Sequence, residues 1–256
     1  MQLKPLSNIK IVLVEPAGTL NIGAVARVMK NMGLQRLVLV NPQCDPLDVE
    51  ARKMAVHADD VLLNAQVVDS LPAALAGCQR AIATTARTRA LNTELENPRV
   101  ALPWLLEVAT PSAIIFGPED RGLSNSELNY AQKFVMIPAD PDYPALNLSH
   151  AVGICAYELS QATLSHQPMN VSEAEIASVD ALESYYQQMT DVLLKMGYLF
   201  PHTAASRMEK LRRLFNRVGM SPIELALLRG IFQKMAWALQ YLPENLLGKK
   251  EDGTKN

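Results

Sequence analysis

The chain has 256 residues, of which 49% are hydrophobic and 20% charged, and its formal net charge is −2. This is the composition of an ordinary globular protein, with room for one large domain or a medium domain with an appendage. We find no apolar run of the roughly 18 residues that a membrane span needs. The first residues carry no secretory pattern, so we expect a cytoplasmic protein without membrane association. The net charge excludes a uniformly basic molecule, and any surface for a polyanion must be a local patch.

Cysteines and histidines give no sign of a metal centre. Cys44, Cys78 and Cys155 lie far apart, and none belongs to a C-x-x-C pair. The four histidines also lack the spacing of metal ligands. We therefore expect neither a disulfide framework nor a bound metal.

Residues 1–165 alternate short β-branched runs with helical patterns, which predicts an α/β domain with a mostly parallel sheet. The strands are apolar at consecutive positions, as expected when helices cover both faces of the sheet. The predicted strands are Ile9–Val14, Arg36–Asn41, Ala81–Thr85, Ala113–Gly117 and Phe134–Pro138. The predicted helices are Ile22–Met32, Asp48–Ala55, Leu71–Ala76, Leu102–Val108, Asn125–Gln132 and Asn147–Thr163.

The pattern changes after residue 165. Residues 166–175 are polar and include a proline, which predicts a linker. We expect a helical extension over residues 176–245 and a disordered tail over residues 246–256. Ser221 followed by Pro222 is typical of a helix start. The extension has three predicted helices, Val179–Met196, Ala204–Val218 and Pro222–Leu242.

The segment Asn21–Arg27 follows the first strand and is the first candidate for a functional site. Its Gly23 would allow close backbone approach at the junction between loop and helix, and a helix N-terminus there could face an anion. The segment lacks the Lys-Ser/Thr of a phosphate-binding P-loop and the G-x-G-x-x-G of a dinucleotide site. An alternative interpretation makes Asn21 a helix cap and Arg27 a surface residue.

Two further loops follow predicted strands, where α/β proteins bind ligands. Phe116–Leu123 contains two glycines together with Glu119 and Arg121, which could also be a mere surface ion pair. Ile137–Asn147 contains three prolines and is therefore stiff, and its Asn147 sits where the next helix needs a cap. A rigid loop of this kind suits a pocket that binds its ligand through backbone hydrogen bonds.

Basic residues gather at two places in the sequence. Arg87 and Arg89 lie in a threonine-rich loop after a strand, where guanidinium groups suit phosphate contacts. The basic side chains of the second predicted helix of the extension form either a solvated face or a surface that contacts an RNA backbone. Its basic residues are Arg207, Lys210, Arg212, Arg213 and Arg217.

Taken together, these segments resemble the SPOUT RNA methyltransferases that modify ribose 2′-hydroxyls, in the TrmH family. Asn21–Arg27, Phe116–Leu123 and Ile137–Leu148 look like that family's three motifs, in order, across residues 8–163. The loop Thr84–Arg89 and the region Leu182–Leu239 further resemble the TrmJ-type tRNA enzymes, which methylate position thirty-two of the anticodon loop.

The resemblance implies a SPOUT fold whose C-terminal part forms a trefoil knot, a homodimer, S-adenosylmethionine as cofactor and tRNA as partner. The residues that it places in catalysis are Arg27, Asn21, Glu119 and Asn147. The cofactor-binding residues that it implies are Thr84, Thr85, Ala86, Gly117, Glu119, Ile137, Pro144, Ala145, Leu146 and Asn147. Those expected to contact RNA are Arg87, Arg89, Arg121, Arg207, Lys210, Arg212, Arg213 and Arg217.

One departure from the family pattern leaves alternatives open. Ala145 stands where many relatives have serine, so a hydroxyl that could contact cofactor or substrate is absent. A non-catalytic RNA-binding relative is therefore one alternative, and a ribosomal-RNA methyltransferase is another. A nucleotide-dependent oxidoreductase is disfavoured by the missing glycine fingerprint. For the enzyme, we expect Arg27 to stay cationic, bind the adjacent phosphate and stabilise the developing oxyanion.

Overall fold

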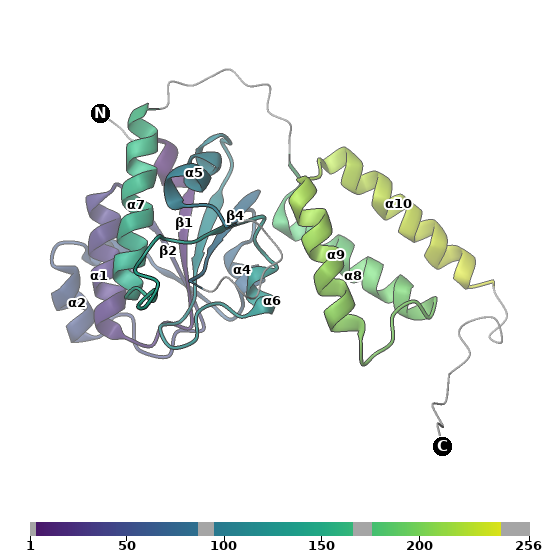
Figure 1. The fold of residues 1–256 in the computed structure, drawn as a ribbon, viewed down its shortest axis with the longest axis horizontal. Helices are drawn as coiled ribbons and strands as arrows, with labels where there is room; N and C mark the ends of the chain where they lie inside the picture. The colour runs from purple at the N-terminus through teal and green to yellow at the C-terminus, as the bar shows by residue number, and fades with distance from the viewer. Residues whose placement is uncertain (1–3, 87–94, 166–175, 242–256) are drawn as a thin grey trace. The chain divides into compact units, whose positions relative to one another are not determined.

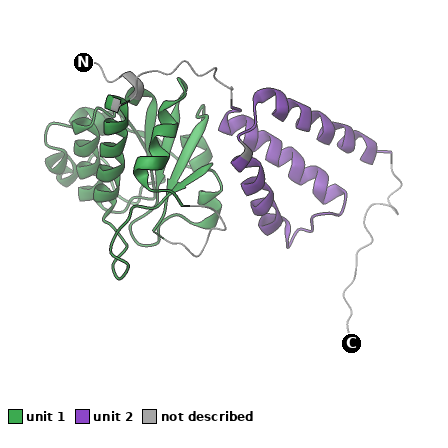
Figure 2. Cartoon of the chain, turned by 45° about the horizontal axis from the view of Figure 1, so that its top comes forward, with its two compact units in different colours: residues 1–173 green, residues 174–256 purple. Residues whose placement is uncertain are grey.

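The computed structural model describes residues 4–86, 95–165 and 176–241, and the chain divides into two compact units, residues 1–173 and 174–256 (Figure 2). The predicted linker, residues 166–175, and the predicted tail, residues 246–256, lie outside the described residues. The boundaries that we drew from the sequence therefore stay predictions.

The first unit is built on a parallel sheet of six strands (Figure 1). The strands are β1 (Ile9–Val14), β2 (Arg36–Val40), β3 (Gln66–Val68), β4 (Arg80–Thr84), β5 (Ser112–Phe116) and β6 (Lys133–Val135). Their order is β3-β2-β1-β5-β4-β6, so β1 and β5 pair at the centre although about a hundred residues separate them, with Ile11 opposite Ile114. Every residue of β1 and β5 is buried, because helices and loops cover both faces.

The prediction of an α/β unit with a parallel sheet is confirmed, and five of the six strands lie within three residues of their predicted bounds. The prediction missed β3, an edge strand of three residues, and extended β6 too far. After Val135 the chain pairs with the loop at Glu96 instead, through a bond from Met136 N–H to the Glu96 carbonyl. The trefoil knot stays a prediction of the resemblance.

Helices surround the sheet and bury a core of aliphatic side chains. Helix α1 packs against α2, α3 and α7. Gly23 lies inside α1 rather than at its start, and a Cβ there would stand 2.1 Å from the Ala51 carbonyl oxygen of α2. Gly23 therefore allows the close backbone approach that we expected, but it does so between α1 and α2 and not at the junction between loop and helix. The helices of this unit are η1 (Lys4–Asn8), α1 (Thr19–Asn31), α2 (Val49–Ala55), α3 (Asp59–Leu63), α4 (Leu71–Ala74), α5 (Pro98–Ala101), η2 (Leu102–Leu106), α6 (Asn125–Leu128) and α7 (Leu148–Ser165).

The second unit consists of α8 (Val179–Lys195), α9 (Ala204–Val218) and α10 (Pro222–Leu239), close to the three predicted helices. Tyr185 and Tyr186 of α8 fill its core and are almost fully buried. Ser221 caps α10 in a capping box with Glu224, as its sequence predicts. Among the described residues, no helix has the length and apolar character that a membrane crossing requires.

Candidate active site

Strands β1, β4, β5 and β6 are parallel, so their carboxyl ends meet at one edge of the sheet. The segments that follow β1, β5 and β6, which are loops together with the first turns of α1, carry the three sequence motifs. Two non-glycine residues at this edge, Glu15 after β1 and Asn41 after β2, have positive φ angles of 46° and 45°. Backbone held in this sparsely populated region is often found near functional sites.

A pocket of about 190 Å³ opens at this edge. Among the ten residues predicted to bind the cofactor, nine line it and Asn147 does not. The first turn of α7 also contributes to the lining, through Leu148 and Ala151. The lining residues are Thr84, Thr85, Ala86, Phe116, Gly117, Pro118, Glu119, Asp120, Arg121, Gly122, Leu123, Val135, Ile137, Pro144, Ala145, Leu146, Leu148 and Ala151. Apolar side chains and backbone groups dominate this set, as they do in small-molecule sites.

Gly117 lets the loop after β5 fold back on itself at the pocket. A Cβ at this position would stand 2.3 Å from the amide nitrogen of Leu123 and 2.4 Å from the carbonyl carbon of Gly122. Both neighbours are backbone atoms that cannot move aside independently. Glycine is therefore a steric requirement of this loop.

One hydrogen-bonded chain joins the three motifs. The Asn21 side chain donates from Nδ2 to Glu119 Oε1 at 2.8 Å, and its Oδ1 accepts from Asn147 Nδ2 at 2.9 Å. Asn147 Oδ1 in turn accepts from the backbone N–H of Ser149 at 2.9 Å and so caps α7, as its place in the sequence predicts. Residues 98 and 126 positions apart are thereby fixed against one another.

Asn21 is not the cap of α1, which was the alternative interpretation of the sequence. The helix begins at Thr19, and its N-cap, Gly18, has no side chain with which to accept a bond. Glu119 supplies the acceptor from another loop, since its carboxylate accepts from the amides of Ala17 at 3.2 Å and Gly18 at 3.3 Å. A carboxylate at this position also faces the positive end of the helix dipole.

These bonds set the ionisation of Glu119. Burial opposes the charged form, but hydrogen bonds from Asn21 and from the amides of Ala17 and Gly18 outweigh it and lower the pKa below its ordinary value of 4.5. The carboxylate is therefore an anion at neutral pH whose acceptor oxygens are already in use. This favours a bracing role over a role as general base.

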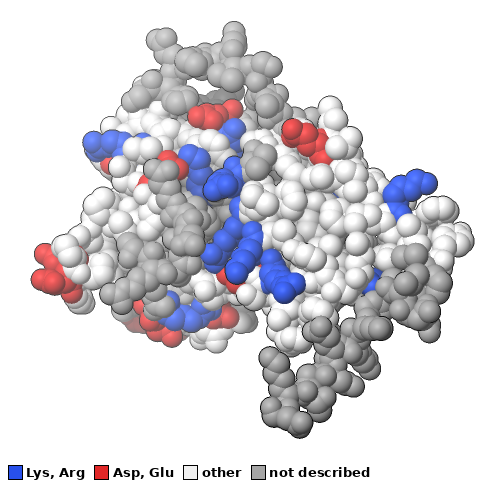
Figure 3. Space-filling model, turned by 45° about the vertical axis from the view of Figure 1, so that its right-hand side comes forward, with Lys and Arg blue, Asp and Glu red and all other residues white. Residues whose placement is uncertain are grey.

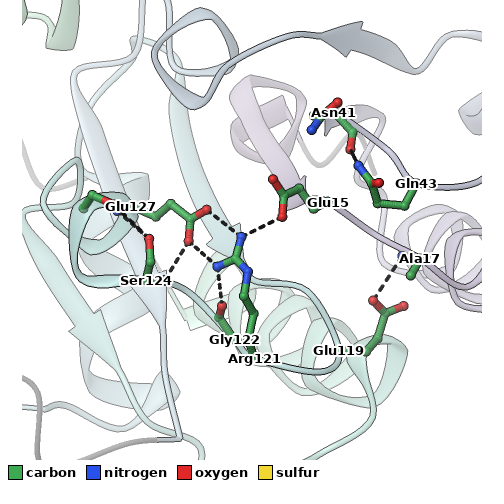
Figure 4. A network of polar contacts seen from close by, with 10 residues as sticks. Glu15, Ala17, Asn41, Gln43, Glu119, Arg121, Gly122, Ser124 and Glu127 are labelled. Atoms are coloured by element: carbon green, nitrogen blue, oxygen red, sulfur yellow. Dashed lines mark hydrogen bonds and ion pairs between the residues drawn. The ribbon is translucent and has the colours of Figure 1, made fainter.

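Arg121 lies beside the pocket at the centre of a second network (Figure 4). Its guanidinium donates to both carboxylate oxygens of Glu127, at 2.9 and 3.0 Å, and to Glu15 at 2.7 Å. The paired carboxylates raise the pKa of Arg121, and hydrogen bonds from Arg121 and Ser124 lower that of Glu127 although burial opposes this. Glu15 is not among the residues predicted from the sequence, although its position directly after β1 was a usable signal. The RNA contact predicted for Arg121 stays a prediction, and the structure shows a cation already held by two anions.

The remaining predicted site residues lie apart from the pocket. Arg27 is exposed on α1, two turns beyond Thr19, and does not line the pocket. It has no hydrogen bond or ion pair within the described ranges. Arg87 and Arg89 lie outside the described residues. Within those residues no three His, Cys, Asp or Glu side chains are grouped as metal ligands would be.

The basic residues of α9 fall into two kinds. Arg207, Lys210 and Arg217 are exposed. Arg212 instead donates to both oxygens of Glu183 and lies 4.6 Å above the Tyr186 ring. Arg213, also partly buried, pairs with Glu209 at 2.6 Å. Lys and Arg side chains form a continuous run on the face drawn in Figure 3, although the whole chain carries a net charge of −2.

The fold and this site match a known class. The SpoU rRNA Methylase family matches residues 8–157, which span the sheet and all the residues that line the pocket. The crystal structure of TrmJ from Z. mobilis superposes with a TM-score of 0.80 at 32% identity, over 89% of this chain and 98% of that one. The first unit is thus a methyltransferase domain of the SpoU, or SPOUT, class.

The second unit narrows the assignment, because the C-terminal domain of the tRNA methyltransferase TrmJ matches residues 180–244. The tRNA (cytidine/uridine-2′-O-)-methyltransferase TrmJ of Pectobacterium atrosepticum is 44% identical over 90% of this chain and 97% of its own length. The TrmJ of Salmonella typhimurium is also 44% identical, over 88% of this chain and 95% of its own length. The chain belongs to the TrmJ family of methyltransferases.

Proposed function

We propose that this protein transfers a methyl group from S-adenosylmethionine to a ribose 2′-hydroxyl of tRNA, at position 32 of the anticodon loop. The observation that carries the proposal is the chain of bonds from Glu119 through Asn21 to Asn147. These bonds join the three motif segments, one of whose residues, Glu119, lines the pocket, and relatives of this chain are named for this reaction. Cytoplasmic location follows from the same proposal and stays a prediction.

The pocket suits the cofactor chemically. Phe116, Val135 and Ile137 offer apolar surface for a heterocycle, and the loop backbone offers hydrogen-bonding groups. The ionised Glu119 and the neighbouring Asp120 give the rim a negative charge, which favours a sulfonium cation. When bound, the cofactor supplies an activated methyl group, and the protein supplies position and charge.

In this proposal Asn21, Glu119 and Asn147 are positioning residues. Both polar atoms of the Asn21 side chain are engaged with the other two residues, so none of the three has to touch the reacting atoms. Their bonds hold the loops of the pocket at the start of α1 and α7. This assigns the polar side chains of the three motifs to positioning rather than to proton transfer.

Arg27 is the residue that we place at the substrate. Its side chain is exposed and presents a planar fork of N–H donors, which matches the geometry of a phosphate. Free of a carboxylate among the described residues, it is available to a phosphate next to the target ribose, where it would stabilise oxyanion character as the hydroxyl loses its proton to water or phosphate.

A homodimer completes the proposal. The outer face of α7 exposes Ile154, Tyr157 and Leu164, at spacings that place them on one side of the helix. Three large apolar side chains in one stripe favour a protein contact over solvent. Sedimentation of the full chain would give twice the 28.1 kDa monomer mass if the proposal holds.

The first test is to incubate the protein with labelled S-adenosylmethionine and unmodified tRNA transcripts, and then map any 2′-O-methyl group by mass. Label at position 32 supports the proposal. Label on ribosomal RNA alone would favour the ribosomal alternative. If neither RNA is labelled while cofactor still binds, the chain is a binding-only relative, which the methyl side chain of Ala145 in the pocket wall favours. The variant Ala145→Ser would then be tested for recovered activity.

The role of Arg27 has its own test. The substitution Arg27→Ala should raise the barrier by about 2–4 kcal/mol, as loss of an oxyanion donor does. Arg27→Lys keeps the charge but loses the fork that binds phosphate with two bonds. A lysine variant with wild-type turnover would contradict the bidentate contact.

A further inference from the structure

Tyr143 is a large aromatic residue that directly precedes three residues of the pocket lining. Its side chain is 80% exposed. It has no hydrogen bond or ring contact with another side chain in the described parts of the chain. The next three residues in the sequence, Pro144 to Leu146, all line the pocket. Tyr143 itself does not, so its ring lies outside the space proposed for the cofactor.

The backbone at Tyr143 is held by a turn and by a following proline. The N–H of Tyr143 donates to the Asp140 carbonyl at 3.0 Å, which closes a β-turn with Pro141 at its second position. The N–H of Asp142 donates to Asp140 Oδ1 at 2.8 Å inside the same turn. Pro144 restricts Tyr143 from the other side, because a residue before proline is confined to extended conformations. The point on the surface from which the Tyr143 side chain extends is therefore fixed, and less backbone entropy is lost when a ligand binds there.

The surroundings of Tyr143 indicate which ligand chemistry it suits. Asp140 and Asp142 are exposed on the same turn, so a phosphate would meet two carboxylates there. A neutral aromatic side chain on the same turn is instead suited to a planar, uncharged ring. Leu146, on the pocket side of the loop, is 38% exposed and adds apolar surface.

We propose that Tyr143 is a substrate-positioning platform on which the nucleobase of the methylated nucleotide, or its direct neighbour, stacks outside the cofactor pocket. Unpaired bases in RNA loops are bound by stacking on aromatic side chains. Stacking would set the ribose over the pocket mouth without reading the base, because each base has a π-face. The inference rests on the proposed function, since it needs an RNA substrate whose ribose reaches this pocket.

The test uses three variants of the full chain. Tyr143→Phe keeps the ring, Tyr143→Leu keeps apolar bulk without a ring, and Tyr143→Ala removes both. We expect kcat/KM for tRNA to stay near wild type in the Phe variant and to fall by roughly 5- to 150-fold in the other two, the range of one lost stacking contact. The affinity for S-adenosylmethionine, measured by calorimetry, should not change in any of them. The matched control is Leu63→Ala, which removes an exposed apolar side chain from α3 and should leave kcat/KM unchanged.

A fluorescent reporter separates stacking from a general loss of activity. Pyrrolocytidine placed at the mapped nucleotide should be quenched on binding to the wild type and the Phe variant, but not to the Leu and Ala variants. S-adenosylhomocysteine would be present so that no methyl group is transferred.

Five outcomes would overturn the inference. A Leu variant with wild-type kcat/KM and quenching shows that no ring is required. A parallel loss of cofactor affinity assigns the loop to the pocket, and dissociation of the dimer in the Ala variant assigns Tyr143 to a subunit contact. A wild type that methylates no tRNA overturns the proposed function and the platform together, whereas an active wild type whose reporter ignores Tyr143 overturns the platform alone.

Discussion

In the α/β unit the polar side chains of the site bind one another, whereas in the helical unit basic side chains of α9 are left exposed. Glu119, Asn21 and Asn147 form hydrogen bonds that fix three segments of the chain. Lys210 and Arg217 are exposed and form no hydrogen bond or ion pair among the described residues, whereas the exposed Arg207 donates to the Tyr198 carbonyl at 2.7 Å. A pocket for a small cofactor needs fixed walls, and a surface for a polyanion needs free charge, so each unit has the arrangement that suits its proposed ligand.

The two units also differ in net charge. The described residues of the helical unit, 176–241, contain eight Lys and Arg against five Asp and Glu, so their net charge is +3, while the whole chain carries −2. The rest of the chain is therefore acidic. An acidic unit suits a sulfonium cofactor and a basic unit suits an RNA backbone, although the overall charge suggests neither.

The largest effect is expected when the two units are separated. Residues 1–173 contain every residue that lines the pocket, so this fragment should bind S-adenosylmethionine like the full chain. Its methylation of tRNA should fall at least about a hundredfold, because the phosphate contacts of the second unit are lost. Calorimetry and a methyl-transfer assay on the same preparation measure both. A fragment with full activity would show that the helical unit is dispensable for substrate binding.

The substitution Glu119→Gln should come next in size. Glutamine keeps the shape of the side chain but replaces a charged acceptor of three N–H groups with a neutral one, so cofactor affinity should fall about tenfold. Affinity for tRNA should not change. Asp120→Asn is the control, since Asp120 also lines the pocket but makes no hydrogen bond to the residues described. Equal losses of cofactor affinity in both variants would show that the affinity depends on negative charge at the pocket and not on the hydrogen bonds of Glu119.

The same carboxylate predicts how cofactor binding depends on pH. The pKa of Glu119 is lowered in the folded protein, so its contribution to stability is fully present above its ordinary value of 4.5 and is lost as the pH falls through the lower, folded value. Cofactor affinity in the wild type should therefore persist somewhat below pH 4.5 and then decline. In the Glu119→Gln variant, cofactor affinity should no longer decline through the titration of this carboxylate. A pH profile identical to that of the wild type would contradict the role of Glu119 in cofactor binding.

A smaller effect is expected on α9. Lys210→Ala and Arg217→Ala should each weaken tRNA binding a few-fold and reduce the slope of log affinity against log salt by about one. The substitution Arg212→Ala should instead lower stability, because Arg212 packs on Tyr186 and pairs with Glu183. Binding titrations at several salt concentrations, with thermal melts alongside, separate the two kinds of residue. Identical salt slopes in all variants would remove α9 from the RNA surface.

The smallest expected effect is confined to the core of the helical unit. Tyr186→Phe removes a buried bond of 2.6 Å to Asn216 Oδ1 and should lower the free energy of unfolding by about 1–2 kcal/mol. Tyr185→Phe should cost nothing, because the Tyr185 hydroxyl is buried without a partner among the described residues. Denaturant melts compare the pair. A larger loss for Tyr185→Phe would contradict this.

Most of the fold could be predicted from sequence patterns, because apolar runs and helix caps depend on residues that are close together in the chain. They placed β1 and α9 at their observed bounds and identified Ser221 as a cap. They missed β3, whose three residues are too few for a pattern, and they left open whether Asn21 caps α1. The reason in the second case is that the acceptor, Glu119, lies about a hundred residues away.

The site was predicted residue by residue but not as an arrangement. Resemblance to a family supplied nine residues that line the pocket, yet nothing local indicates that Asn21 bonds to both Glu119 and Asn147. The same holds for α9, where a run of arginines looks uniform in sequence. Only tertiary contacts separate Arg212, which is bound to Glu183, from the exposed Arg217.

The bond between Asn21 and Asn147 has a consequence for how the protein is made. Strand β1 leaves the ribosome early but cannot pair with β5 until residue 116 has been synthesised, and Asn21 has no second partner until residue 147 follows. Contacts this distant in sequence form slowly, and N-terminal segments wait for them during synthesis. The nascent chain should therefore be unable to hold its cofactor until α7 has emerged, so that a prematurely terminated product is inactive rather than partly active.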